Sequence, residues 1–211
     1  MADYNESLEL DPRLSNAHLG RGLVLAHREN YDLAIEEYDK AIELDPDNAW
    51  AYGDRGWAHN WRGEDTRAIT DYTKAIELDP TEAYFFNGRC WAYYLLKDLD
   101  HALSDCNRAI EIDARDANSL DSRCAIYIEK KQYDLAIKDC TSAITLDPKN
   151  GEPFFHRGDA LYLKGQLAEA LADLKQADAL LPRAYPDRTA LVDRIAAIEK
   201  KMGGSPSDVI H

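Results

Sequence analysis

Apolar residues recur along the chain at helical spacing, in short stretches that are separated by polar turns. In one stretch, Ala34, Ile35, Tyr38, Ala41 and Ile42 form a single apolar stripe with the period of an α-helix. Similar stripes return along the chain at a constant interval. A fixed period of this kind is typical of stacked supersecondary units, so the pattern predicts a helical repeat protein.

Prolines mark the same period, because a proline cannot continue a helix and therefore ends one. The dipeptide Asp-Pro occurs four times at a constant spacing, the one from Asp11 to Asp45. One copy is missing, and the spacing across that gap is twice as long. The copies are Asp11-Pro12, Asp45-Pro46, Asp79-Pro80 and Asp147-Pro148, and the missing member falls at Asp113-Ala114.

Small residues occupy fixed positions when Ser15 is counted as position 1 of the first repeat. Positions 20 and 27 are Ala in all five copies, and position 8 is always Gly or Cys. Small side chains let helix backbones approach closely, so each repeat is predicted to hold two helices, at about positions 1–14 and 17–30. One such hairpin cannot bury its apolar stripe alone, whereas stacked neighbours can.

This pattern resembles the tetratricopeptide repeat (TPR) family, in a bacterial-type variant with Arg-Gly at positions 7 and 8. The chain matches the family pattern at positions 8, 20, 27 and 32 and in part at 24, but position 7 is Arg where the family has Leu. The resemblance covers residues 15–184. It implies an all-α fold, a right-handed superhelical α-solenoid of helix-turn-helix repeats.

The register also divides the chain. Residues 3–12 align with residues 37–46, so the chain opens in a second helix whose first helix is absent, which we interpret as a truncated repeat. The predicted segments are 1–14 as that helix, TPR 1 to TPR 5 at 15–48, 49–82, 83–116, 117–150 and 151–184, a C-terminal capping helix at 185–202, and a disordered tail at 203–211.

The Arg at position 7 is matched by an acid at position 23 in every repeat. Position 23 lies on the second helix at about the level of position 7 on the first, so the pairs are predicted to form an interhelical salt-bridge ladder. The pairs are Arg21–Glu37, Arg55–Asp71, Arg89–Asp105, Arg123–Asp139 and Arg157–Asp173.

The four cysteines fall on packing positions of the repeat. Cys90 and Cys124 stand at position 8, and Cys106 and Cys140 stand at position 24. Buried free thiols that fill space are the favoured interpretation. Disulfides Cys90–Cys106 and Cys124–Cys140, or a bridge between repeats, stay open as the alternative for an exported protein. A four-cysteine zinc site is disfavoured, because no Cys-x-x-Cys element is present.

The charge balance bears on partners. Lys and Arg number 25 and Asp and Glu number 39, which gives 25 − 39 = −14. Nucleic acids and anionic membranes need clustered basic residues, so neither is expected as the main partner. No apolar run is long enough for membrane insertion. The compartment stays open: the sequence as written indicates the cytoplasm, and export would follow if a signal peptide preceded it.

No catalytic constellation stands out. The sequence has no His-Glu-x-x-His, Gly-x-Ser-x-Gly or phosphate-loop motif, and its histidines share no repeat position. We therefore predict a protein that is not an enzyme and that needs no cofactor or metal.

Aromatic residues gather where the resemblance places the concave surface, at positions 2, 5, 9, 12 and 13 of the first helices. Exposed aromatics rimmed by polar groups often mark a recognition surface, although stabilising packing is the alternative. The predicted peptide-binding residues are Trp50, Trp57, Trp61, Tyr84, Trp91, Tyr94, Phe155 and Tyr162. Trp57 and Trp91 share position 9, which predicts that they are neighbours along the groove.

The predicted rim is acidic, so a protein or peptide partner with apolar and basic residues would suit it. The rim residues are Asp54, Asn60, Asn87, Asp121, Glu129, Glu152, His156 and Asp159. The clamp that some family members use for chaperone C-termini needs Lys, Asn and Arg at fixed positions, and no register of this chain supplies them. An Hsp70- or Hsp90-type carboxylate clamp is therefore rejected.

Together these patterns predict a non-catalytic interaction scaffold that binds a peptide segment in an aromatic-lined concave groove. The alternative is a structural assembly module that self-associates or docks through its ends or convex face.

Overall fold

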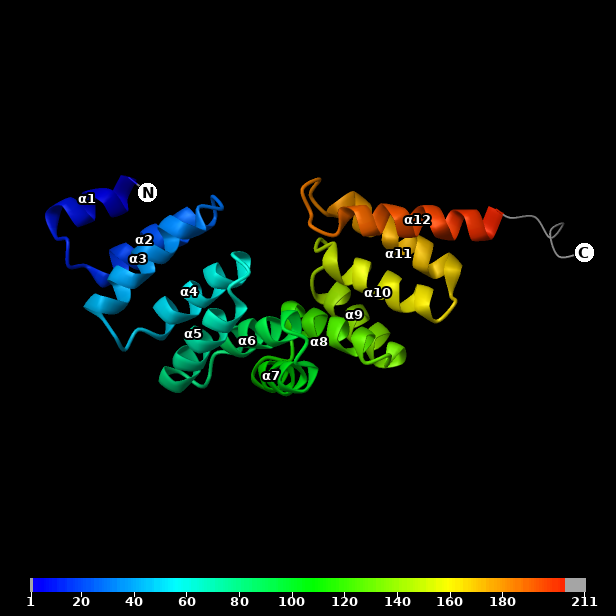
Figure 1. The fold of residues 1–211 in the computed structure, drawn as a ribbon, viewed down its shortest axis with the longest axis horizontal. Coiled ribbons are helices and arrows are strands. Elements are labelled where there is room, and N and C mark those ends of the chain that lie inside the picture. The colour runs from blue at the N-terminus through cyan, green and yellow to red at the C-terminus, as the bar shows by residue number, and fades with distance from the viewer. Residues whose placement is uncertain (1, 204–211) are drawn as a thin grey trace, which may run out of the picture. The chain divides into compact units, whose positions relative to one another are not determined.

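The computed structural model describes residues 2–203, and within that range every regular element is an α-helix (Figure 1). The helices are α1 (Ala2–Leu10), α2 (Ser15–Ala26), α3 (Tyr31–Leu44), α4 (Ala49–Trp61), α5 (Asp65–Leu78), α6 (Ala83–Leu95), α7 (Leu99–Ile112), α8 (Ala117–Glu129), α9 (Tyr133–Leu146), α10 (Glu152–Leu163), α11 (Leu167–Leu180) and α12 (Arg188–Gly203). The all-α prediction is confirmed. The predicted disordered tail lies outside the described residues from 204 onward.

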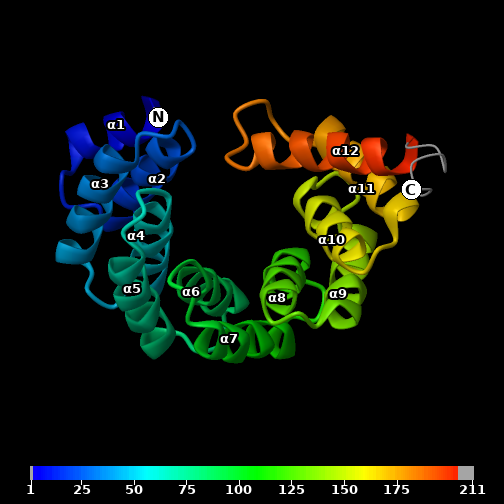
Figure 2. The ribbon, with the colours of Figure 1, turned by 45° about the vertical axis from the view of Figure 1, so that its right-hand side comes forward.

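The chain divides into two compact units. Unit 1 spans Met1–Ala114 and takes in α1 to α7, and unit 2 spans Arg115–His211 and takes in α8 to α12. In unit 1, α2 packs on α3, α4 on α5 and α6 on α7. Successive pairs then pack through α3 on α4 and α5 on α6. Figure 2 shows α2, α4 and α6 on one side of unit 1 and α3, α5 and α7 on the other.

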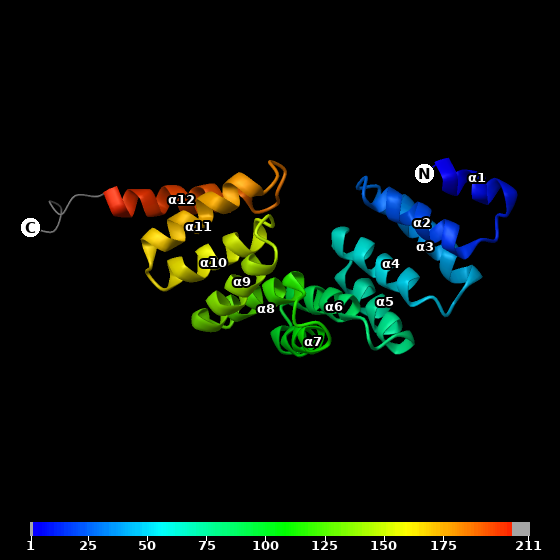
Figure 3. The ribbon, with the colours of Figure 1, turned by 180° about the vertical axis from the view of Figure 1, so that it is seen from behind.

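Unit 2 repeats the same arrangement. Here α8 packs on α9, α9 on α10 and α10 on α11, and the first helices α8 and α10 also touch each other. The final helix, α12, packs on α11 (Figure 3). Each unit is therefore a stack of helix hairpins, the helical-repeat solenoid arrangement that the sequence period predicts.

The small residues act as expected. Ala34, Ala41 and their counterparts at positions 20 and 27 of the other repeats are fully buried. At position 8, a Cβ on Gly22 would lie 2.5 Å from the ring of Tyr38, and one on Gly158 would lie 2.7 Å from Leu174. Glycine at position 8 thus makes room for the large residue at position 24 of the same repeat.

The cysteines correct the favoured interpretation of free thiols. Cys90 is bonded to Cys106 and Cys124 to Cys140, and the chain has no free cysteine. The reason is the geometry of positions 8 and 24, which face each other across a hairpin with Cα atoms 5.4 and 5.6 Å apart. That separation suits a disulfide. The third and fourth repeats thus use Cys with Cys where the others use Gly with a large residue.

The salt-bridge ladder is confirmed in every repeat. In four repeats the guanidinium donates hydrogen bonds to both carboxylate oxygens. For example, Arg89 Nε lies 2.7 Å from Asp105 Oδ2, and Arg89 Nη2 lies 2.9 Å from Asp105 Oδ1. In the first repeat, Nε and Nη2 of Arg21 both reach one oxygen of Glu37, at 2.7 and 2.6 Å. The acids are buried, with Asp71 and Asp139 each 5% exposed. Such forked pairs fix the register of the two helices.

Ladder arginines also reach back to position 25 of the preceding repeat, a second contact that the sequence reasoning missed. Arg55 Nη1 donates to Asp39 Oδ1 at 2.6 Å, and Arg89 Nη1 donates to Thr73 Oγ1 at 3.1 Å. The same contact joins Arg157 to Thr141 and Arg21 to Asn5. The signal was present, because position 25 holds an acceptor in every copy that precedes another repeat. The ladder therefore links repeats as well as the helices inside one repeat.

The first and last helices each pack on the neighbouring helix of their unit. Helix α1 packs on α2, and its Asn5 Oδ1 accepts a hydrogen bond from Arg21 Nη1, the contact that position 25 makes in other repeats. In α12, Leu191 and Ile198 are fully buried against the last repeat. Among the described helices, none is both long and apolar enough to cross a membrane.

Candidate binding face

Most of the predicted contact residues lie on two neighbouring helices of unit 1. The helical period aligns Trp50, Trp57 and Trp61 on α4 and Tyr84, Trp91 and Tyr94 on α6. These two helices touch each other. We call the surface formed by these six side chains the aromatic face.

One group on this face is built around Trp50. Trp50 is 44% exposed, and its ring stacks on Tyr84 with centroids 5.7 Å apart and lies edge-to-face with Phe85 at 5.2 Å. Gly53 makes the approach possible, because a Cβ there would lie 2.4 Å from the Phe85 ring. Phe85 is fully buried, so it anchors an exposed tryptophan to the core.

A second group is built around Trp61, which is 56% exposed. It stacks on Tyr31 at 6.0 Å, with the two rings nearly parallel. Trp57 is half-buried and meets the edges of both Tyr31 and Trp61. Sequence reasoning missed Tyr31, which begins α3. A hollow of about 250 Å³ adjoins this group, lined by Glu29, Asn30, Tyr31, Asp32, Leu33 and Arg62.

The third group joins Trp91 and Tyr94, whose centroids lie 4.9 Å apart. The expected neighbour relation between Trp57 and Trp91 has no ring contact to support it among the described residues. Trp57 instead has Tyr31 and Trp61 as ring partners. The aromatic face is thus three local groups rather than one continuous stack.

The two predicted residues of unit 2 lie in different surroundings. Phe155 is 7% exposed and belongs to the hydrophobic core, with Tyr185 against its edge, so it offers little surface to a partner. Tyr162 is covered by the chain itself. Arg194 and Lys201 lie over its ring at 5.0 and 4.8 Å, and Lys201 Nζ donates to its hydroxyl at 3.0 Å.

A buried acid lies beneath the aromatic face. Asp54 is 7% exposed, and its one hydrogen bond within the described chain comes from the Tyr84 hydroxyl at 3.4 Å. The hydroxyls of Tyr38 and Tyr72 are buried without a hydrogen-bond partner in that same range. Burial raises the pKa of both phenols, and the charge of Asp54 raises each further, which places them near it. Burial also raises the pKa of Asp54 to about 7.

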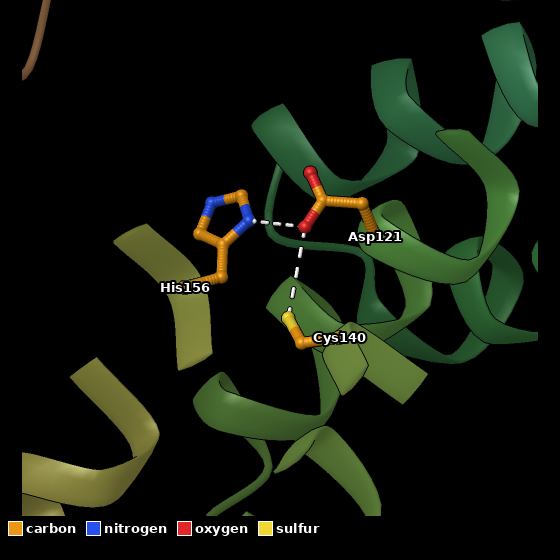
Figure 4. A group of neighbouring side chains, drawn as sticks. All are labelled: Asp121, Cys140 and His156. Carbon is orange, nitrogen blue, oxygen red and sulfur yellow. Dashed lines mark hydrogen bonds and ion pairs between the residues drawn. The ribbon is translucent and has the colours of Figure 1, made fainter. Parts of the chain in front are cut away.

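On the first helices of unit 2, the buried Asp121 and the partly buried Asp159 are each paired with a cation. Asp121 is 5% exposed and lies 2.8 Å from His156 Nδ1 (Figure 4). Burial acts to lower the pKa of His156, but the charge of Asp121 and the bond to it outweigh this and raise that pKa to about 9. Asp159, one turn further along α10, is paired with Arg194 at 2.7 Å.

Asp121, His156 and Cys140 together resemble a set of metal ligands. Their ligand atoms lie within 4.8 Å of one another, and Figure 4 shows all three converging. However, the Cys140 sulfur is bonded to Cys124 and cannot act as a thiolate. The imidazole is held as the cationic partner of Asp121, so neither the imidazole nor the carboxylate paired with it is a free metal ligand. We therefore assign no metal to this group.

Comparison with known proteins agrees with this architecture. Family models match residues 24–60 as "TPR repeat" and residues 126–188 as "Tetratricopeptide repeat". No curated protein matches the sequence. Among solved structures, the chain is similar to YrrB, "a TPR protein with an unusual peptide-binding site", at 20% identity, covering 90% of this chain and 96% of that one with a TM-score of 0.62.

Two further structures share the fold. TTC0263 of Thermus thermophilus is 20% identical over 87% of this chain and 100% of its own, with a TM-score of 0.76. The APC/C assembly Cut9–Hcn1 is 18% identical over 92% of this chain and 38% of that chain, with a TM-score of 0.83.

Stacked hairpins with a constant sequence period define the class, a helical-repeat solenoid. With two matching family models, the chain is a tetratricopeptide repeat protein. The TPR fold supports a role as a protein-interaction scaffold, and proteins of this family are generally not enzymes.

Proposed function

We propose that this scaffold binds a segment of a protein partner against the aromatic face of unit 1. The observation that carries the proposal is the exposure of Trp50 and Trp61, each stacked on a tyrosine that holds it in place. Rigid, exposed aromatic rings give large contact area at low entropic cost, and they dominate many recognition surfaces.

We propose a peptide segment as the occupant of this face. YrrB, which is similar in fold, has a peptide-binding site, although 20% identity transfers no residue roles.

The test is a pull-down with purified protein as bait, read out by mass spectrometry. A Trp50→Ala, Trp61→Ala double variant removes the two most exposed rings of the aromatic face. Trp57 is left intact because it packs into the core of unit 1 and its loss would weaken the fold. We expect a partner that the wild type holds to be lost from the double variant.

The matched control is Leu135→Ala, which removes an exposed apolar side chain from the second-helix side of unit 2. It should keep the partner, and circular dichroism should show equal helicity for all three proteins. Identical partner sets for the wild type and the tryptophan variant would contradict the proposal. They would move recognition to the ends or the second-helix side, where light scattering would then test self-association.

A further inference from the structure

We infer that Asp54 is the counter-ion for a lysine or arginine side chain of the segment bound on the aromatic face. This inference rests on the proposed function and names the chemistry of its partner.

The first step is the unbalanced surroundings of this carboxyl group. Within the described residues, the groups that bond to Asp54 or whose pKa its charge raises are all phenols: Tyr38 on α3, Tyr72 on α5 and Tyr84 on α6. No Lys, Arg or His of the described chain bonds to it. A buried carboxylate without a cation is costly, and proteins usually pair such a charge. Two buried hydroxyls without partners add to this cost.

The second step comes from unit 2, where the chain supplies the missing cations itself. Asp121 forms an ion pair with His156, and Asp159 forms one with Arg194 of α12. On the ladder, too, every buried acid has its arginine. Asp54 thus departs from how this chain treats its other buried acids.

The third step is the exposed ring beside the acid. Asp159 and Tyr162 lie one turn apart on α10, and Arg194 bonds the acid while its guanidinium covers the ring at 5.0 Å. Trp50 and Asp54 are likewise one turn apart on α4, and Tyr84 joins them by stacking on the first and bonding the second. A long basic side chain can lie along such a ring while its charged end reaches the acid.

The occupant we commit to is therefore a basic residue of a protein segment. A single carboxylate among phenols offers too few charged ligands for a divalent cation, which prefers several oxygen ligands. The net charge of −14 also favours a basic partner during association.

The probe is a displayed library of random dodecapeptides, selected on the wild type, on Asp54→Asn and on Asp47→Asn. Asp47 is exposed and lies just before α4, so this control variant changes the net charge of the same unit by the same amount. The strongest wild-type peptide is then synthesised with its basic residue kept or replaced by norleucine. Its affinity for all three proteins is measured by calorimetry.

We expect Lys or Arg at a fixed spacing from apolar residues in peptides selected on the wild type and on Asp47→Asn. On Asp54→Asn this basic position should lose its preference while the apolar positions remain. Norleucine should weaken binding to the wild type by about tenfold or more, and should have little effect on Asp54→Asn.

Two results would overturn the inference separately from the proposed function. One is a set of apolar peptides with no basic preference on the wild type, and the other is an equal norleucine effect on Asp54→Asn. A wild type that selects no peptide at all would overturn both proposals.

Stability gives a readout that needs no peptide. Because burial raises the pKa of Asp54 from 3.8 to about 7, its ionised form penalises the fold fully above pH 7, and this penalty fades as pH falls toward 4. Asp54→Asn should therefore melt at a higher temperature than the wild type at pH 8, with a smaller gain at pH 5. A lower melting temperature at pH 8 would show that the carboxylate serves the fold, against the inference.

Discussion

The two units place acidic residues on their first helices in different surroundings. In unit 2, Asp121 and Asp159 are each paired with a cation of the chain, and one of these cations comes from α12. In unit 1, the described residues provide no cation for Asp54, and the groups that bond to it or respond to its charge are phenols. The repeat frame is the same in both, so the frame does not determine whether an acid is satisfied. In unit 2, helix α12 supplies Arg194 as the cation for Asp159.

The largest effect on stability is expected from breaking the salt-bridge ladder, which both units share. Arg89→Ala strands the buried carboxylate of Asp105 and frees Thr73, so it should cost about 3 to 5 kcal/mol of unfolding free energy. Urea denaturation followed by circular dichroism measures this.

Arg108→Ala is the control for that variant, because Arg108 forms an exposed pair with Glu111 on a single helix. Such a pair contributes less than about 1 kcal/mol. Equal midpoints for the two variants would mean that the ladder is only a surface feature.

An intermediate effect is expected from the disulfides, of which each unit has one. Cys90→Ala with Cys106→Ala should cost about 3 kcal/mol, because the bond joins residues 16 apart in sequence and so closes a loop in the unfolded chain. Cys90→Gly with Cys106→Tyr should lose less, since it restores the Gly–Tyr pair of the first two repeats. Thermal unfolding with and without a thiol reductant compares the two.

The reductant supplies the control for that comparison. It should lower the melting temperature of the wild type. In either variant, the Cys124–Cys140 bond is the one disulfide left for the reductant to break. If the Gly–Tyr variant were less stable than the Ala–Ala variant, a Gly–Tyr pair would not be able to replace the disulfide at positions 8 and 24, contrary to this prediction.

The smallest effect on stability is expected in unit 2. Arg194→Ala with Lys201→Ala uncovers Asp159 and the Tyr162 ring, and because both cations are partly exposed the cost should be about 1 kcal/mol. The variant should bind a Lys-containing peptide that the wild-type unit 2 does not, as measured by calorimetry in an Asp54→Asn background. Lys175→Ala, which breaks the exposed pair with Glu199, is the control. Equal peptide binding by both variants would contradict the role of α12 as a cover.

The sequence predicted what the period repeats. The helices, the alanine contacts and all five Arg–acid pairs follow from positions that agree in every copy. The prediction failed where the surroundings of a residue depend on segments outside the repeat pattern. Phe155 stands at a position that is small or polar in most other copies, but it packs into the core beside Tyr185, which precedes α12. No repeat pattern contains that contact.

Other features depend on distances that a periodic pattern does not give. Whether Cys90 meets Cys106 depends on a Cα separation of 5.4 Å across the hairpin, and packing alone could not choose between thiols and a bond. The hydrogen bond from Tyr84 to Asp54 joins two helices that are far apart in the sequence. The part of the candidate site predicted from sequence is therefore its exposed rings, and its buried acid chemistry needed the structure.

The backward contact of the ladder also determines where the array can grow. The arginines use an acceptor in the repeat before them, and the last repeat has Lys175 at that position, a donor bonded to Glu199. The following helix carries Leu191, fully buried, where an arginine would continue the series. Duplication of one internal repeat would preserve the pairing of arginine with acceptor, whereas a copy added after α11 would find no acceptor. Lengthening from within therefore keeps the backward contact of the arginines, and lengthening at this end loses it.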